Sequence, residues 1–168
     1  MAVISNATPL IYLTKSGSLK LFKKLFDSIL IPKVVYEEVV VKGKEEGFSD
    51  AIVVEEQIEE GWISTDNLGT DEKLVEHATE LDKGETAVIK LAKEKDDPLL
   101  LIDDAAGRQI AKSFGLEVKG TLYVILRAYK EGYLTKDQSR DILDEIISAG
   151  FRISSEQYSQ VLSRLEKL

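Results

Sequence analysis

The sequence predicts an α/β fold, a three-layer α/β/α sandwich around a mostly parallel sheet. Short apolar runs alternate along the 168 residues with longer segments of helical periodicity. The clearest run, at residues 99–102, is wholly apolar, which is typical of a strand buried on both faces of a parallel sheet. The length and the 43% hydrophobic content are those of one domain with its own core.

Strands in the first half of the chain are expected at residues 2–5, 29–31 and 62–64. A helix follows the first of them, because Pro9 suits a first helical turn, and Ser16-Gly17-Ser18 interrupts its apolar periodicity. The other expected elements are a helix from Pro32 to about residue 40, a polar loop at 42–47 and a helix at about 49–60.

The second half continues the alternation and ends in helices. The expected elements are a turn at 67–70, a helix at 73–81, a helix after Asp82-Lys83-Gly84-Glu85, the strand at 99–102, a helix ending near residue 114, a strand at 116–118, and helices at 120–130, 136–148 and 155–166. We therefore expect an α/β domain over residues 1–134 and a C-terminal helical extension, residues 135–168, packed on the same domain.

The balance of charge narrows the classes of function. The chain carries 30 acidic and 22 basic residues, a formal net charge of −8, which argues against a protein that holds nucleic acid by bulk attraction. Binding through a metal ion and a few local bases remains open. No run approaches the roughly 20 apolar residues of a membrane span, and no signal segment begins the chain, so we expect a cytoplasmic protein that does not enter membranes.

Polar and acidic residues follow the predicted strands. Asp103 and Asp104 come directly after the strand at 99–102, and Asn6 follows the first strand. The carboxyl ends of parallel strands share one edge of the sheet, where α/β proteins place their ligands. Carboxylates at such an edge suit a hard cation such as Mg²⁺ or Mn²⁺. Each residue alone has a plainer interpretation, since Asp104 also suits a helix cap and acids are favoured in any first helical turn.

Four motifs taken together resemble the PIN-domain family. Val3-Ile4-Ser5-Asn6-Ala7-Thr8-Pro9-Leu10-Ile11 resembles its opening strand and site. The segments that look like the next three motifs are Ile31-Pro32 with Val35 and Glu38-Val39, then Leu81-Asp82-Lys83-Gly84-Glu85-Thr86-Ala87, then Leu101-Ile102-Asp103-Asp104 through Arg108 and Ala111. The resemblance runs from Val3 to about Gly132. It implies a nuclease that cleaves RNA phosphodiester bonds with Mg or Mn as its cofactor.

Carried over by position, the resemblance implies roles for individual residues. Glu38, Glu85 and Asp103 are the expected catalytic carboxylates, and the expected metal ligands are Asn6, Glu38, Glu85, Asp103 and Asp104, the last being either an auxiliary ligand or a cap. Thr8 stands where the family often carries a hydroxyl that contacts substrate. Arg108 and Lys112 flank the expected acidic site and are candidates to contact phosphates.

Asn6 departs from the family pattern, which has an acid at this position. An amide ligates a cation through its carbonyl oxygen but adds no charge. The alternative function is therefore a catalytically weakened PIN domain that acts as an RNA- or protein-binding module.

The motif Lys119-Gly120-Thr121 before an apolar helix looks like the stand-alone PIN proteins related to VapC-type toxins. That resemblance implies a single-stranded RNA substrate, a role as the toxin of a toxin–antitoxin pair, and a small antitoxin protein as partner. The apolar faces of the helices from Leu122 onward exceed what one small sheet requires, which predicts a homodimer.

Overall fold

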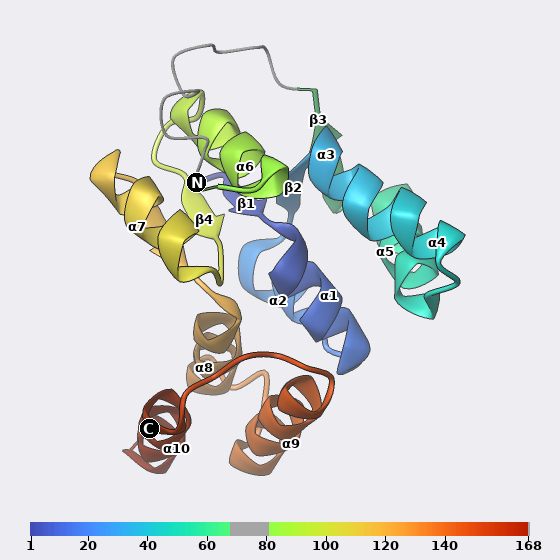
Figure 1. Ribbon diagram of the computed structural model, residues 1–168. Helices are drawn as coiled ribbons and strands as arrows, with labels where there is room; N and C mark the ends of the chain where they lie inside the picture. The colour runs from blue at the N-terminus through green and yellow to red at the C-terminus, as the bar shows by residue number, and fades with distance from the viewer. Residues whose placement is uncertain (68–80, 168) are drawn as a thin grey trace.

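The computed structural model describes residues 1–67 and 81–167, and these contain a five-stranded parallel sheet (Figure 1). The strands are β1 (Val3–Ser5), β2 (Ile29–Pro32), β3 (Ile63–Asp66), β4 (Leu99–Leu101) and β5 (Glu117–Lys119). Their order across the sheet is β3-β2-β1-β4-β5. The predicted α/β fold is confirmed, and the sheet is parallel at each of its four pairings.

The order of the strands marks where a ligand site belongs. The chain runs outward from β1 to β2 and β3, then returns past β1 to form β4 and β5 on the other side. Neighbouring crossovers therefore diverge at the carboxyl ends of β1 and β4, and such a reversal opens a crevice in doubly wound sheets. The backbone N–H of Asn6 donates to the carbonyl of Leu101 across this point, at 3.0 Å.

Helices cover both faces of the sheet. Since crossovers between parallel strands are right-handed, connections that run in opposite directions lie on opposite faces. One layer thus holds α1 (Ala7–Lys15), α2 (Leu21–Phe26) and α5 (Ser49–Glu59), and the other holds α6 (Lys83–Lys93) and α7 (Ala105–Ser113). Side chains such as Ile4, Leu100 and Ile89 are fully buried between the layers.

Three helices form a group below the sheet in Figure 1. They are α8 (Thr121–Lys130), α9 (Lys136–Ser148) and α10 (Ser155–Lys167). Helix α8 packs on α1 and α2, α9 packs on α1 and α8, and α10 packs on α8 and α9. Much of the apolar surface that predicted a homodimer is thereby buried within one chain, including Val124, Ile146 and Leu165. These faces no longer argue for a partner.

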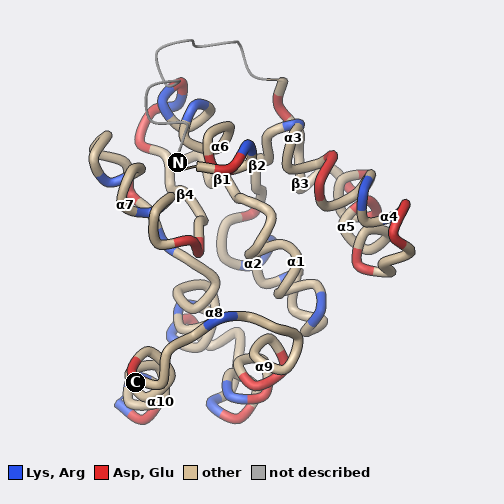
Figure 2. The backbone as a smooth tube through the Cα atoms, in the orientation of Figure 1, with Lys and Arg blue, Asp and Glu red and all other residues tan. Residues whose placement is uncertain are grey.

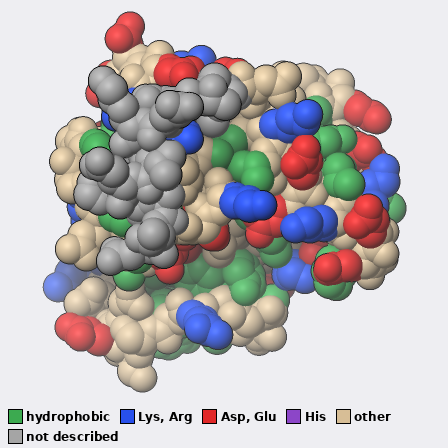
Figure 3. All heavy atoms as spheres, turned by 45° about the horizontal axis from the view of Figure 1, so that its top comes forward, with side chains coloured by type: hydrophobic (Ala, Val, Ile, Leu, Met, Phe, Trp, Pro, Cys, Tyr) green, Lys and Arg blue, Asp and Glu red, His purple; other side chains and the backbone are tan. Residues whose placement is uncertain are grey.

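A helical hairpin projects from the sheet beyond β2. It consists of α3 (Lys33–Tyr36), the π-helical segment η1 (Glu37–Lys42), α4 (Gly43–Glu45) and α5. The polar loop predicted at 42–47 is wrong for residues 42–45, which continue the helix. Lysine and glutamate favour helices, and Gly43 packs closely on Ala51, where an added Cβ would lie 2.9 Å from the Ala51 Cβ. Figure 3 shows apolar side chains among charges of both signs on the hairpin, at the right.

The remaining predicted elements agree with the structure to within a few residues. The helix predicted at 73–81 and most of the turn at 67–70 lie outside the described residues. Lysine, arginine and acidic residues are spread along the whole described backbone, so the net charge is not confined to one region (Figure 2). No described helix is long and apolar enough to cross a membrane.

Candidate active site

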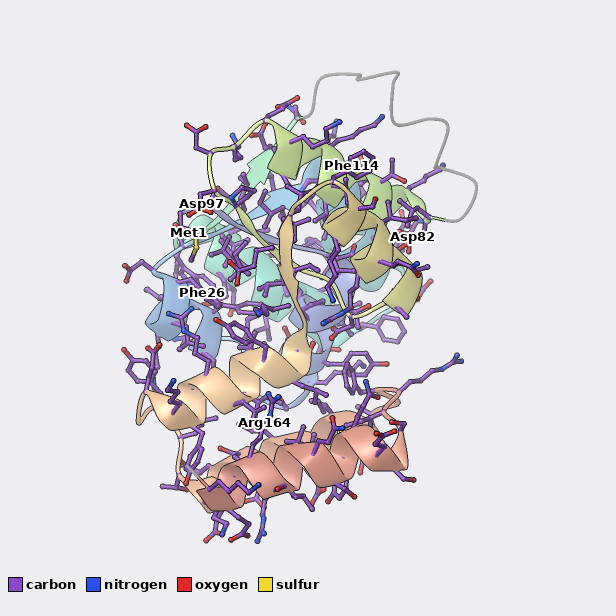
Figure 4. All side chains as sticks on the ribbon, turned by 90° about the vertical axis from the view of Figure 1, so that its left-hand side faces the viewer. Met1, Phe26, Asp82, Asp97, Phe114 and Arg164 are labelled. Atoms are coloured by element: carbon purple, nitrogen blue, oxygen red, sulfur yellow. The ribbon has the colours of Figure 1, made fainter. Side chains whose placement is uncertain are left out.

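Three polar side chains from different elements surround Gly84 in the first turn of α6. Asn6 follows β1, Glu38 lies in η1, and Asp82, which is labelled in Figure 4, precedes α6. A Cβ placed on Gly84 would lie 2.7 Å from Asn6 Oδ1, 3.3 Å from Asp82 Oδ1 and 3.6 Å from Glu38 Oε2. Only a glycine at this position leaves room for the three oxygens. We call Asn6, Glu38, Asp82 and the adjoining Glu85 the acidic centre.

The Asn6 side chain is buried and lacks a partner for its oxygen. The residue is 5% exposed, and among the described residues nothing donates a hydrogen bond to Asn6 Oδ1. Asn6 occupies the N-cap position of α1, where an asparagine commonly accepts a bond from the helix backbone, but its side chain makes no such bond. A buried acceptor without a donor costs free energy, so a ligand that contacts this oxygen would be stabilising.

Asp82 and Glu85 hold each other in a capping box. The Glu85 N–H donates to Asp82 Oδ1 at 2.7 Å, and the Asp82 N–H donates to Glu85 Oε2 at 3.2 Å. Glu85 is buried beneath the first turn of α7, where a Cβ on Gly107 would lie 3.2 Å from Glu85 Cδ. Two carboxylates are thus fixed side by side at the start of one helix.

Burial and the charges of neighbouring acids raise the pKa of two carboxyls of the acidic centre, those of Glu85 and Glu38. Burial raises the pKa of Glu85 to about 7, with further increases from the charges of Asp82, Asp104 and Glu38, while its bond from the Asp82 backbone acts in the opposite direction. The pKa of Glu38 is also raised, first by burial and then by Asp82, against a smaller effect of Lys42. A nearby cation would relieve this repulsion.

Asp103 is bonded to the start of α8. Its Oδ1 accepts a bond from the Thr121 N–H at 2.8 Å, and its Oδ2 accepts one from Thr121 Oγ1 at 2.6 Å. Burial raises the pKa of Asp103, while the two Thr121 bonds and the Arg108 charge counteract that rise. The structure therefore brings together Asn6, Glu38 and Glu85 of the expected ligands, whereas both carboxylate oxygens of Asp103 accept hydrogen bonds from Thr121.

The other predicted residues lie around this edge. Asp104 accepts a bond from the Gly107 N–H at 2.9 Å, so it caps α7, and its charge also acts on Glu85. Arg108 and Lys112, on α7, line a cavity that also contains Asp103. Thr8 is half-buried in the first turn of α1.

Sequence reasoning missed Asp82 as a member of the site. The signal was present, because an acid three residues before a glutamate at a helix start is the pattern of a capping box. That pattern predicts a helix start, and only the folded arrangement shows that the same carboxylate faces Asn6 and Glu38 across Gly84.

The oxygens of the acidic centre suit a magnesium or manganese ion. No three acidic or histidine side chains of the described residues stand close enough to hold a metal by themselves. Mg²⁺ commonly takes one or two carboxylates and completes its shell with water. Glu38, Asp82 and the unpartnered Asn6 Oδ1 supply two carboxylates and one amide oxygen around a common point, so the donor set fits such an ion.

The comparisons with known proteins gave one family. A protein-family model described as a PIN domain matches residues 2–167, nearly the whole chain. No curated protein and no solved structure matches the chain.

Proposed function

The chain belongs to the PIN-domain family, which has a nuclease fold. We propose that it is a divalent-metal-dependent ribonuclease that hydrolyses RNA phosphodiester bonds. The unpartnered oxygen of Asn6 between Glu38 and Asp82 carries the proposal. A cation bound there would satisfy the Asn6 oxygen and reduce the repulsion between the carboxylates. The fold agrees, because the arrangement lies where the crossovers diverge.

Each residue of the proposed site has a distinct task. Glu38 and Asp82 would hold Mg or Mn together with the carbonyl oxygen of Asn6, and Glu85 fixes Asp82 through the capping box. A bound divalent ion would activate a water and neutralise charge on the phosphate. Asp103 orients the start of α8 through Thr121, and it remains a proposed catalytic carboxylate together with Glu38 and Glu85.

A binding module without catalysis is the second candidate function. Asn6 contributes no negative charge, and both oxygens of Asp103 already accept hydrogen bonds. Fewer free anions mean weaker metal binding and less help in removing a proton from water. These two observations favour a slow nuclease or an RNA- or protein-binding derivative over a fast enzyme.

The proposal extends to the biological setting implied by the VapC-like features. We propose a cytoplasmic toxin of a toxin–antitoxin pair, silenced by a small antitoxin protein, acting as a homodimer on single-stranded RNA. Its support is the resemblance of Lys119-Gly120-Thr121 and the helix after it to that branch of the family.

Incubation of the purified protein with end-labelled single-stranded RNA tests the proposed function. Cleavage is expected with Mg²⁺ or Mn²⁺ and not with EDTA, and it is expected to disappear in Glu38→Gln. Cleavage that persists in EDTA or in Glu38→Gln would exclude the proposed site. Tight RNA binding without any cleavage would select the binding module.

A further inference from the structure

A basic groove lies next to the acidic centre, between α7, α8 and α10. Its volume is about 680 Å³, within the range of pockets that hold ligands. Five cationic side chains line it, and the one acid among its lining residues is Asp103. The cations are Arg108, Lys112, Lys119, Arg152 and Arg164. In a chain of net charge −8, this local excess of positive charge is the opposite of the average surface.

Most of this positive charge is free to meet a ligand. Among the residues that the structure describes, Lys112, Arg152 and Arg164 form no ion pair within 4.0 Å, and Asp103 is occupied by Thr121. Figure 4 shows Arg164 between α8 and α10. Cations gathered around one hollow repel one another, and an anion that bridges them relieves this repulsion.

The floor of the groove is apolar. It is formed by side chains of α8, by a residue that follows α9 and by one of α10, namely Leu122, Tyr123, Leu126, Phe151 and Val161. The half-buried Tyr123 contributes an aromatic ring, and Lys119 Nζ lies 5.4 Å from the centre of that ring. Aromatic and apolar surface flanked by cations is the combination that binds single-stranded nucleic acid, where bases stack while phosphates pair with lysine and arginine.

We infer that this groove binds a single-stranded RNA segment and that the C-terminal helix α10 forms one wall of its path. A paired duplex keeps its bases stacked on each other, so it cannot offer them to the apolar floor. The start of α7 connects the groove to the acidic centre, because Arg108 lines the groove while the preceding residue, Gly107, lies against Glu85, where an added Cβ would be 3.2 Å from Glu85 Cδ. The choice of RNA rests on the proposed function, but the binding itself does not require catalysis.

Binding without metal tests the inference separately from cleavage. A fluorescein-labelled oligouridine of twelve nucleotides is titrated in EDTA, and its anisotropy is followed against salt concentration. Arg152→Gln/Arg164→Gln removes two exposed cations from the groove. Each phosphate contact with a single strand contributes about −0.7 to the slope of log K against log salt. The double variant should therefore show a slope shallower by about 1.4 and bind about 25-fold more weakly at 0.1 M salt.

A matched variant controls for net charge. Lys20→Gln/Lys130→Gln removes the same charge from exposed positions that do not line the groove, and its affinity should stay within about twofold of wild type. Equal affinities of the two double variants would overturn the inference. So would a duplex of the same length that binds as tightly as the single strand, or polyglutamate that displaces the RNA at equal concentration, since the latter would identify an acidic peptide as the occupant.

The nuclease function and the RNA-binding groove can be tested separately, because either can be wrong while the other is right. A wild-type protein that binds oligouridine through the groove but never cleaves RNA with Mn²⁺ contradicts the nuclease and retains the groove. A protein that cleaves RNA while the arginine variant binds like its lysine control retains the nuclease and contradicts the groove.

Discussion

At the scale of single residues, Asn6 and Glu85 are each in an unfavourable environment that a bound cation would improve. The side-chain carbonyl oxygen of Asn6 is buried and receives no hydrogen bond from residues 1–67 or 81–167, whereas burial and neighbouring acids disfavour the negative charge of Glu85. A bound cation would coordinate the Asn6 oxygen and would also stabilise the ionised Glu85 carboxylate. Both residues could be named from the sequence because they stand in motifs that resemble those of the PIN-domain family, whereas each position alone also has a plain structural interpretation.

The stability of the metal-free protein should depend on Glu85 ionisation. Its pKa rises from 4.5 to about 7 on folding, so between these values the folded protein holds a proton that the unfolded chain has released. The free energy of unfolding is therefore greatest below pH 4.5 with respect to this group and falls as pH rises to 7, by at most about 3 kcal/mol. Urea unfolding in EDTA at pH 5, 6, 7 and 8 measures this fall.

Glu85→Gln is the matched variant for that measurement. The amide keeps an oxygen for the Asp82 N–H and removes the ionisation, so most of the decline between pH 5 and 7 should vanish. A smaller decline should remain, because the pKa of Glu38 is raised as well. A wild-type protein whose stability is flat or rises over this interval would contradict the assigned environment of Glu85.

At the scale of elements, the turns of helix that carry the site differ from ordinary helix. Glu38 lies in a π-helical segment, and Gly84 stands in the first turn of α6 where an alanine would usually be better. The spacing of apolar residues predicted both helices, because it shows which face of a helix is buried. It could not predict the π-helical turn or the crowding at Gly84, because both depend on packing between segments distant in sequence.

Gly84→Ala should disturb the site despite its favourable helix propensity. On an exposed helix this change gains up to about 1 kcal/mol. Here the added Cβ would lie 2.7 Å from Asn6 Oδ1, so Asn6 or Asp82 must move, and we expect a net loss of stability of about 1–3 kcal/mol and weaker Mn²⁺ binding.

Lys83→Ala, at the preceding exposed position, provides the control and should stay close to wild type in both measurements. Urea unfolding and calorimetric titration compare the two variants. A Gly84→Ala protein that is more stable than wild type and binds Mn²⁺ normally would show that the glycine has no special role.

At the scale of the whole molecule, the fold points to the projecting hairpin, rather than the C-terminal helices, as the surface for self-association. The C-terminal helices bury their apolar faces internally, whereas exposed apolar side chains gather on the projecting hairpin. They are Val41, Phe48, Ile52 and Val53, with exposures of 40%, 51%, 52% and 39%. The sequence pattern showed which helices are amphipathic but not how the chain would cover them, so it could not predict that much of this apolar surface is buried within one chain.

We expect the proposed homodimer to use this hairpin. Light scattering at micromolar concentration should give twice the 18.7 kDa of one chain, and Phe48→Glu/Ile52→Glu should return a single-chain mass. Tyr133→Ser, which removes an exposed aromatic ring from a different part of the chain, should leave the dimer intact. A wild-type mass near 18.7 kDa would rule the homodimer out.

We propose that the oxygens around Gly84 hold a divalent cation, and calorimetric titration with Mn²⁺ measures this binding without depending on RNA or cleavage. Wild type should bind Mn²⁺, and Glu38→Gln should weaken binding at least tenfold, while Glu37→Gln, which removes an adjacent exposed charge, should not. Asn6→Asp should bind about tenfold more tightly, at some cost in metal-free stability from the clustered charges. Equal affinities for Glu38→Gln and Glu37→Gln, or an Asn6→Asp protein that binds no better than wild type, would contradict the account.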